Sequence, residues 1–186
     1  MPRSEYVPGS SDDPSVQAAT TKALELVTDG ARIGLGSGRA VSAFIAKLGA
    51  RRREGLRIKG VAASLSSTQA AQRAGIPLIE FGEGGPLDLT FDGADEVAPN
   101  LDLIKGRGGA MVRERILAAA SASQVIIVGE HKLVRALGER GNVPVEVIPF
   151  AEWPAMKELK TLGLVPTRRM ETDGSRPLIT DNGNLF

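Results

Sequence analysis

Short apolar runs alternate with amphipathic segments over the first 143 residues. Asp13-Pro14 combines an N-cap residue with proline at the first helical position, and the apolar spacing that follows predicts a helix ending by Gly30. Further predicted helices cover about 40–48, 67–74 and 110–120, and predicted strands cover 31–35, 56–62, 77–81, 87–91 and 124–128. The last strand has the continuous apolar character of a buried one. This alternation predicts an α/β fold, a Rossmann-like parallel sheet with helices on both faces.

The pattern changes after Asn142. Strand-like alternation over 144–150 is followed by helical spacing over 152–162 and by two further strand-like runs, 165–171 and 177–186. This order predicts a small α+β domain, ferredoxin-like and incomplete, because the chain stops inside a predicted strand. We therefore expect two domains, 1–143 and 144–186. The first ten residues are polar and rich in Pro, Gly and Ser, so we expect them to be loose.

Composition excludes several kinds of chemistry. The chain has no cysteine, which rules out disulfides, cysteine zinc sites, iron–sulfur clusters and thiol nucleophiles, and its single histidine, His131, leaves no histidine pair for a metal. Lys and Arg number 23 against 22 Asp and Glu, so the net charge of +1 lacks the basic excess of a nucleic-acid-coating protein. No run resembles a signal peptide or approaches the roughly 20 apolar residues of a membrane span. We expect a soluble, cytoplasmic protein with no nucleic acid or membrane partner.

A glycine-rich segment, Gly34-Leu35-Gly36-Ser37-Gly38, lies between a predicted strand and a predicted helix. Glycines let backbone N–H groups approach an anion, and the helix N-terminus favours negative charge, so the segment is a candidate phosphate cradle. A tight strand-to-helix turn would explain the same glycines equally well. The third glycine comes one residue too early for the dinucleotide fingerprint, and the P-loop lysine is absent.

A second constellation begins with three acids after an apolar strand, in Asp92-Gly93-Ala94-Asp95-Glu96. Taken alone, these acids could form an acidic surface turn. They are followed, however, by Lys105, by the glycine loop Gly106-Arg107-Gly108-Gly109, and by a predicted helix that carries Glu114. Acids that can move protons, beside a cation and backbone donors that can hold an oxyanion, suit enolisation next to a carbonyl.

At these residues the sequence resembles the ribose-5-phosphate isomerase type A family. The glycine-rich segment is similar to the family's phosphate loop, Asp92–Glu96 matches its DGADE motif, and Lys105–Ala110 with Arg113-Glu114 matches its KGxGGA–RE segment. Further similarity covers the GEHKL segment around Lys132, the PVEV segment at 144–147 and the TDNGN segment at 180–184.

The resemblance implies a function and residue roles. It implies interconversion of D-ribose 5-phosphate and D-ribulose 5-phosphate through a cis-enediolate, without metal or cofactor, by a homodimer or homotetramer. Glu114 would be the base that moves a proton between C1 and C2, Asp92 with Asp95 nearby would serve ring opening and hydroxyl proton transfer, and Lys105 would steady the enediolate. The remaining implied binding positions are the Gly106, Arg107, Gly108 and Gly109 backbone at the enediolate, and Gly36, Ser37, Gly38, Arg39, Ala40 and Lys132 at the phosphate.

The sequence departs from the family in three places. The phosphate loop usually reads G-T/S-G-S-T, but here Arg39-Ala40 stand where two hydroxyl residues are expected. The family also often has a lysine in the first helix, where this sequence has Val16-Gln17, so the phosphate site has lost a cation as well. Arginine can bind phosphate in a bidentate manner, so Arg39 is a candidate replacement, although it could simply face solvent. Family members also usually continue about 35–40 residues past the TDNGN segment, as the resemblance implies.

Two other functions compete with the isomerase. A non-catalytic sugar-phosphate sensor is one, since related folds serve as ligand domains of transcription regulators, but only about 13 residues precede the first predicted helix, too few for a helix-turn-helix domain. An inactive or structural homologue is the other. Asp92, Asp95, Lys105 and Glu114 together favour an enzyme, because a sensor needs no proton-transfer base.

Overall fold

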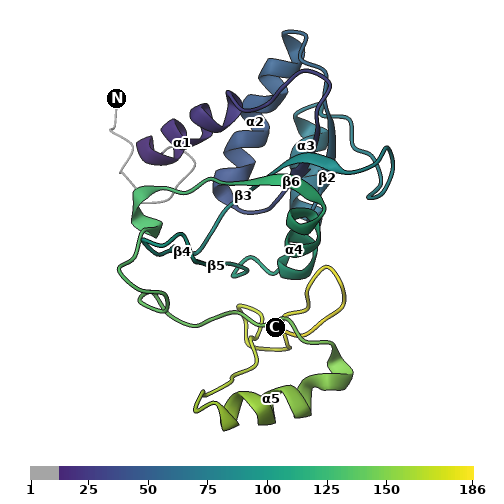
Figure 1. Cartoon of the computed structure of the whole chain (residues 1–186). Helices are drawn as coiled ribbons and strands as arrows, with labels where there is room; N and C mark the ends of the chain where they lie inside the picture. Colours follow the sequence, from purple (N-terminus) through teal and green to yellow (C-terminus); the bar gives the residue numbers. More distant parts are fainter. Residues whose placement is uncertain (1–12) are drawn as a thin grey trace.

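The computed structural model describes residues 13–186 (Figure 1), so the predicted loose N-terminal segment lies outside the described residues. Its centre is a four-stranded parallel sheet in the order β2-β1-β3-β6. The strands are β1 (Arg32–Leu35), β2 (Lys59–Ala62), β3 (Leu87–Asp92) and β6 (Ser121–Ile126). The predicted α/β class is therefore confirmed.

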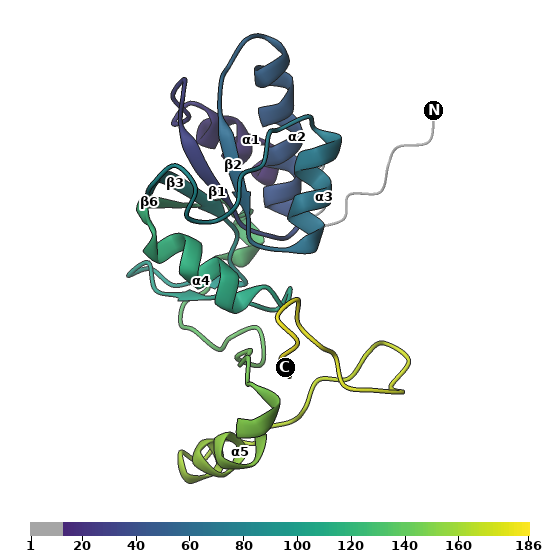
Figure 2. The same cartoon turned by 90° about the vertical axis from the view of Figure 1, so that its right-hand side faces the viewer.

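Alternation along β3 divides the helices between the two faces of the sheet. Phe91 points to one face, where its ring stacks on Phe44 with centroids 4.2 Å apart. Thr90 points to the other face and hydrogen-bonds the Leu117 carbonyl oxygen at 3.3 Å. Thus α2 (Arg39–Arg53) and α3 (Leu65–Arg73) cover one face with α1 (Pro14–Leu24) packed on α2, and α4 (Met111–Ala119) covers the other (Figure 2).

The helices begin where the caps predict. Asp13 caps α1 by accepting a hydrogen bond from the Ser15 N–H at 2.9 Å, and Pro14 is the first helical residue. The helix ends at Leu24, earlier than the predicted stop at Gly30. In contrast, α2 runs five residues further than predicted, through the exposed Arg51–Arg53. None of the helices described in residues 13–186 is long and apolar enough to cross a membrane.

Two strand predictions in this part of the chain are wrong. Residues 77–81 form no strand but only a single parallel bridge, between Leu78 and Gly60. The last strand of the sheet, β6, is also not buried: Ala122, Ser123 and Gln124 are exposed, because among residues 13–186 β6 lies at the edge of the sheet, paired with β3 alone. The apolar run that suggested a buried strand instead continues into Ile127, which is 1% exposed just past the strand end.

The region 144–186 forms the α-helix α5 (Glu152–Thr161), preceded by a 3-10 turn over Pro149–Ala151, but not the three predicted strands. The predicted strands are reduced to isolated antiparallel bridges that join Val147 to Leu185, Met170 to Pro177, and Ile179 to Leu185. Single bridges cannot build the continuous ladder that a strand needs. Figures 1 and 2 show α5 and the C-terminal loops lying below the parallel sheet.

Candidate active site

The sheet brings together three segments that are far apart in the sequence. Parallel strands present their carboxyl ends at one edge, and β1, β3 and β6 end there at Leu35, Asp92 and Ile126. A short antiparallel hairpin of β4 (Glu96–Val97) and β5 (Leu103–Ile104) then leads the chain back to the same edge at Lys105. The glycine-rich segment, the acids and the lysine therefore meet at one place.

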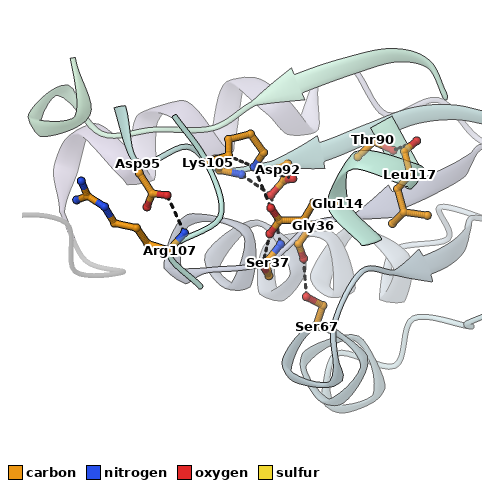
Figure 3. A network of polar contacts seen from close by, with 11 residues as sticks. Gly36, Ser37, Ser67, Thr90, Asp92, Asp95, Lys105, Arg107, Glu114 and Leu117 are labelled. Atoms are coloured by element: carbon orange, nitrogen blue, oxygen red, sulfur yellow. Dashed lines mark hydrogen bonds and ion pairs between the residues drawn. The ribbon is translucent and has the colours of Figure 1, made fainter. Parts of the chain in front are cut away.

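Asp92, Lys105 and Glu114 form a charged cluster at this edge (Figure 3). The Lys105 Nζ lies 2.8 Å from Asp92 Oδ2 and 3.3 Å from Glu114 Oε2. Asp92 is 0% exposed and Glu114 is 5% exposed, so both carboxylates are almost completely removed from solvent. One ammonium group thus bridges two buried carboxylates, an arrangement expected of a catalytic site rather than of a surface turn.

The ammonium group of Lys105 has a limited number of donors. It carries three N–H bonds, and it also donates one hydrogen bond to the Gly93 carbonyl oxygen at 2.5 Å. Its contact with Glu114 is the longest of the three. An oxyanion arriving at Lys105 can therefore replace Glu114 most easily, which would leave that carboxylate free to accept a proton.

Burial raises the pKa of Asp92 to about 6. The Glu114 carboxylate acts in the same direction, while the ammonium of Lys105 and the Gly93 N–H, which donates to Asp92 Oδ1 at 2.7 Å, lower the pKa, and the value of about 6 is the balance of these effects. The desolvation of the carboxylate dominates. A carboxyl group with a pKa near 6 can both accept and return a proton close to neutral pH, which is what general acid–base catalysis requires.

The glycine-rich segment supports both carboxylates from below. The Ser37 hydroxyl donates a hydrogen bond to Glu114 Oε1, and the Ser37 N–H donates to Asp92 Oδ1 at 3.3 Å. Gly36 lies directly under Asp92, since a Cβ at this position would come within 2.2 Å of Oδ1. Its carbonyl oxygen accepts a hydrogen bond from Ser67 Oγ at 2.5 Å. Gly36 is thus required for close approach and does not line the cavity.

The second glycine loop contributes fewer backbone donors than the sequence predicted. The Arg107 N–H is used by Asp95 Oδ2 at 2.9 Å, and the Gly109 N–H donates to the Gly106 carbonyl oxygen at 2.9 Å. The Arg107 side chain reaches the buried Glu96 at 3.4 Å. Gly106 and Gly108 line the cavity, whereas Arg107 and Gly109 do not.

A cavity of about 220 Å³ opens above the cluster. Its other end is lined by Gly38, Arg39, Ala40 and Lys132. Gly38 is the N-cap of α2 with φ of +96°, a conformation that favours glycine, and it directs the first turn of the helix to the cavity. Arg39 is exposed and Lys132 is partly buried, and burial lowers the pKa of Lys132. This end has the charge and the helix N-terminus expected of a phosphate site.

Most of the predicted site residues therefore line one cavity, but the sequence interpretation missed part of its wall. The additional lining residues are Val16, Gly93, Ala94, Ile127, Val128, Gly129 and His131. The residues after Val128 follow a predicted strand, at the position where a parallel sheet places its site, but only Lys132 among them was given a role from the sequence. Val16 stands where the family often has a lysine, and the packing of α1 brings it to the cavity.

Comparison with protein families connects this geometry to known proteins. The model of the family described as ribose 5-phosphate isomerase A (phosphoriboisomerase A) matches residues 59–186. Ribose-5-phosphate isomerase A 1 of Oceanobacillus iheyensis is 46% identical over 171 residues, which cover 91% of this chain and 75% of the relative. Ribose-5-phosphate isomerase A of Archaeoglobus fulgidus is 47% identical over 168 residues, with 90% and 73% covered.

Solved structures give the same result. A D-ribose-5-phosphate isomerase in complex with phospho-erythronic acid superposes with a TM-score of 0.88 at 37% identity, covering 92% of this chain and 76% of that one. Ribose 5-phosphate isomerase A from Methanocaldococcus jannaschii has a TM-score of 0.87 at 39% identity, with 91% and 76% covered. The chain thus spans about three quarters of the length of these relatives.

Proposed function

The chain belongs to the ribose 5-phosphate isomerase A family and interconverts D-ribose 5-phosphate with D-ribulose 5-phosphate, and we propose that Glu114, Asp92 and Lys105 carry the proton transfers. The observation that supports this assignment is the buried carboxylate–ammonium–carboxylate cluster at the floor of a cavity whose other end is cationic. The family assignment supplies the substrate, and the geometry supports the proposed roles.

The first step opens the sugar ring. The phosphate lies at the N-terminus of α2 beside Arg39 and Lys132, which places C1 and C2 over the cluster. Asp92 accepts the proton of the C1 hydroxyl and returns a proton to the ring oxygen, so that the C1–O bond to the ring breaks and an aldehyde forms. Its pKa of about 6 suits both halves of this exchange.

The second step moves a proton between carbons. Glu114 removes the proton from C2, and the electron pair forms the C1–C2 double bond of a cis-enediolate while negative charge develops on the C1 oxygen. Glu114 then returns the proton to C1, and the C2 oxygen becomes the ketone carbonyl as its hydroxyl proton passes to the C1 oxygen through Asp92. Ser37, which donates to Glu114 Oε1, fixes the carboxylate so that Oε2 faces the substrate.

Stabilisation of the enediolate is the role of Lys105 and the glycine loop. The ammonium exchanges its long contact with Glu114 for the enediolate oxygen, and the Gly106 and Gly108 backbone lies at the same wall of the cavity. The charge on Lys105 stays constant while the charge on the substrate oxygen grows, so this interaction is strongest in the transition state.

The domain division and the assembly belong to the same proposal. We assign residues 1–143 to the catalytic domain and 144–186 to the small domain, because the parallel sheet and the cavity-lining residues all come from the first part. The chain is further proposed to act as a homodimer or homotetramer, the assembly implied by the family resemblance.

Glu114→Gln tests the assignment of the base. The substitution retains the shape and the contact with Ser37 but removes the proton acceptor, so we expect kcat to fall by about 10²–10⁴-fold with little change in KM. Ketose formation from ribose 5-phosphate measures kcat, and solvent deuterium appearing at C1 of the ketose reports the proton transfer itself. Glu54→Gln, an exposed carboxylate at the end of α2, is the matched control and should behave as the parent does.

The result that would contradict the assignment is a folded Glu114→Gln enzyme with near-parental turnover. A parent chain that binds the sugar phosphate without producing ketose would instead favour the sensor function.

A further inference from the structure

His131, the single histidine of the chain, lies in the cavity wall next to the proposed phosphate end. It belongs to the short 3-10 turn η1 (Glu130–Lys132), directly before Lys132. Both ring nitrogens are buried, and neither has a hydrogen-bond partner among residues 13–186. An imidazole with two unsatisfied nitrogens beside a polar cavity is unusual, because buried polar groups are nearly always paired.

The ring is held in place by its surroundings. It folds back over Gly129, where an added Cβ would lie 2.8 Å from Nδ1, so a larger residue at 129 would displace it. Nδ1 lies 3.8 Å from Oδ2 of Asp13, the N-cap of α1. Ser15 links the two elements, since its Oγ donates to Asp13 Oδ1 at 2.6 Å and accepts from the Glu130 N–H at 3.2 Å. The imidazole therefore has a fixed position between the start of α1 and the cavity.

The charges around the ring come from four parts of the structure. Lys132 belongs to the same turn as His131, with the exposed Glu130 on the other side; Arg39 belongs to α2, Arg140 to the following loop, and Asp13 to the cap of α1. Burial lowers the pKa of His131 most, and the three cations lower it further, whereas Asp13 raises it. Without a bound anion, this surrounding favours the neutral imidazole near neutral pH.

We propose that His131 is a member of the phosphate subsite that takes up a proton when the phosphate dianion of the substrate binds, so that Arg39, Lys132 and the imidazolium hold the anion together. The inference rests on the proposed function, because that function places the phosphate at this end of the cavity. It assigns to the lone histidine a binding role, with Glu114, Asp92 and Lys105 left as the catalytic groups.

The direction of the linkage follows from the charges. A bound dianion compensates the cations that disfavour the imidazolium, and this interaction between charges needs no direct hydrogen bond to the buried ring nitrogens. The pKa of His131 is thus lowered in the free enzyme and raised in the complex, and binding takes up a proton at pH values between the two. The affinity for the dianion must then decrease as the pH rises through the pKa of the complex.

Because the chain has one histidine, its imidazole resonances in an NMR spectrum are assigned without ambiguity. We would follow them against pH in the full chain, alone, with inorganic phosphate, and with phospho-erythronic acid. We expect the anions to raise the pKa of His131 by about one unit or more, which corresponds to tenfold tighter binding to the protonated form. Unphosphorylated erythronate is the matched control ligand and should not change it.

His131→Gln supplies the kinetic test. Glutamine can donate a hydrogen bond but does not titrate, so the variant should raise KM for ribose 5-phosphate about tenfold near pH 6 and much less near pH 8, with kcat within about twofold of the parent. The phosphate group has its own second pKa of about 6, but parent and variant share this substrate, and the ratio of their KM values cancels its effect.

Two results would overturn the inference. One is a pKa of His131 that does not move although calorimetry shows the phosphorylated ligand binding, and the other is a KM ratio independent of pH. Failure of the proposed function is recognised separately, as the absence of ketose formation by the parent enzyme. Even then, the pKa of His131 measured by NMR with and without inorganic phosphate still tests the inference.

Discussion

Alanine substitutions at Gly36 and Gly34 can show whether the exact position of Asp92 matters for catalysis. The first would displace Asp92, and the second would disturb the packing around Thr90. Both glycines lie on the face of the sheet that Thr90 and Asp92 also share. A Cβ at 36 would come within 2.2 Å of Asp92 Oδ1, and a Cβ at 34 would come within 2.1 Å of Thr90 Oγ1. The shortest approaches are similar, but the clash at 36 is the more severe, because Cγ and Cβ of Asp92 would also lie within 2.3 and 2.7 Å, and only this clash involves the cluster with Lys105 and Glu114.

Relief of the clash in Gly36→Ala requires Asp92 to move by about 1 Å, and a displacement of this size in a catalytic constellation costs on the order of 10²-fold in rate. Overpacking of a buried contact destabilises a protein by about 1–3 kcal/mol, so both variants should lose stability, Gly36→Ala more than Gly34→Ala. Thr90 is 0% exposed and hydrogen-bonds Ser121 Oγ at 2.5 Å, so it has as little room as Asp92.

The assay compares kcat per folded enzyme with the urea midpoint of each variant. Gly36→Ala should lose about 10²-fold in kcat, while Gly34→Ala should keep kcat within a few-fold although its midpoint also falls. Equal losses of kcat in both variants would mean that general loosening, and not the position of Asp92, limits the reaction. A fully active Gly36→Ala would show that the Asp92 carboxylate has no fixed role.

Three further predictions address the remaining groups of the site. Lys105→Met should lower kcat with little change in KM, because the ammonium acts on charge that develops in the transition state; a rise confined to KM would make Lys105 a substrate anchor instead. Arg39→Ala should raise KM for ribose 5-phosphate roughly 10- to 150-fold, and restoring the hydroxyl pair with Arg39→Ser and Ala40→Thr should recover part of the loss; a KM within about twofold of the parent would make Arg39 a surface residue. The raised pKa of Asp92, about 6, implies that kcat falls as the pH drops through that value and the carboxylate is protonated, a limb that should be absent from any residual activity of Asp92→Asn.

Several parts of this site could be predicted from the sequence because they depend only on residues that are neighbours along the chain. The Asp13-Pro14 cap, the apolar strand ending at Asp92 and the glycines before α2 and α4 each impose their structure through the backbone of neighbouring residues. Parallel strands end at a common edge, so the approach of the acids to the glycine-rich segment followed from topology alone.

Which groups of the site contact one another could be learned only from the tertiary structure. Gly106 to Gly109 look equivalent as a glycine loop, but the folded loop engages the Arg107 and Gly109 N–H groups in its own hydrogen bonds and leaves Gly106 and Gly108 at the cavity. In the same way, the predicted strands of 144–186 have alternating apolar and polar residues. Such alternation decides which side chains would lie on the same face of a strand, but it does not supply a pairing partner. A strand forms when a neighbour completes its ladder, and here the neighbours meet at single bridges.

What the sequence by itself determined was the class of fold and the family, and it also indicated the acids and the lysine of the proposed site, because these depend on residue type and spacing. What only the tertiary structure decided was their electrostatic state. The pKa of Asp92 depends on how completely the carboxylate is buried and on Glu114, 22 residues further along the chain, and the surroundings of His131 depend on α1 and α2 meeting η1. Burial and charge proximity are properties of the folded chain, since they arise from residues that are distant in sequence and close in space.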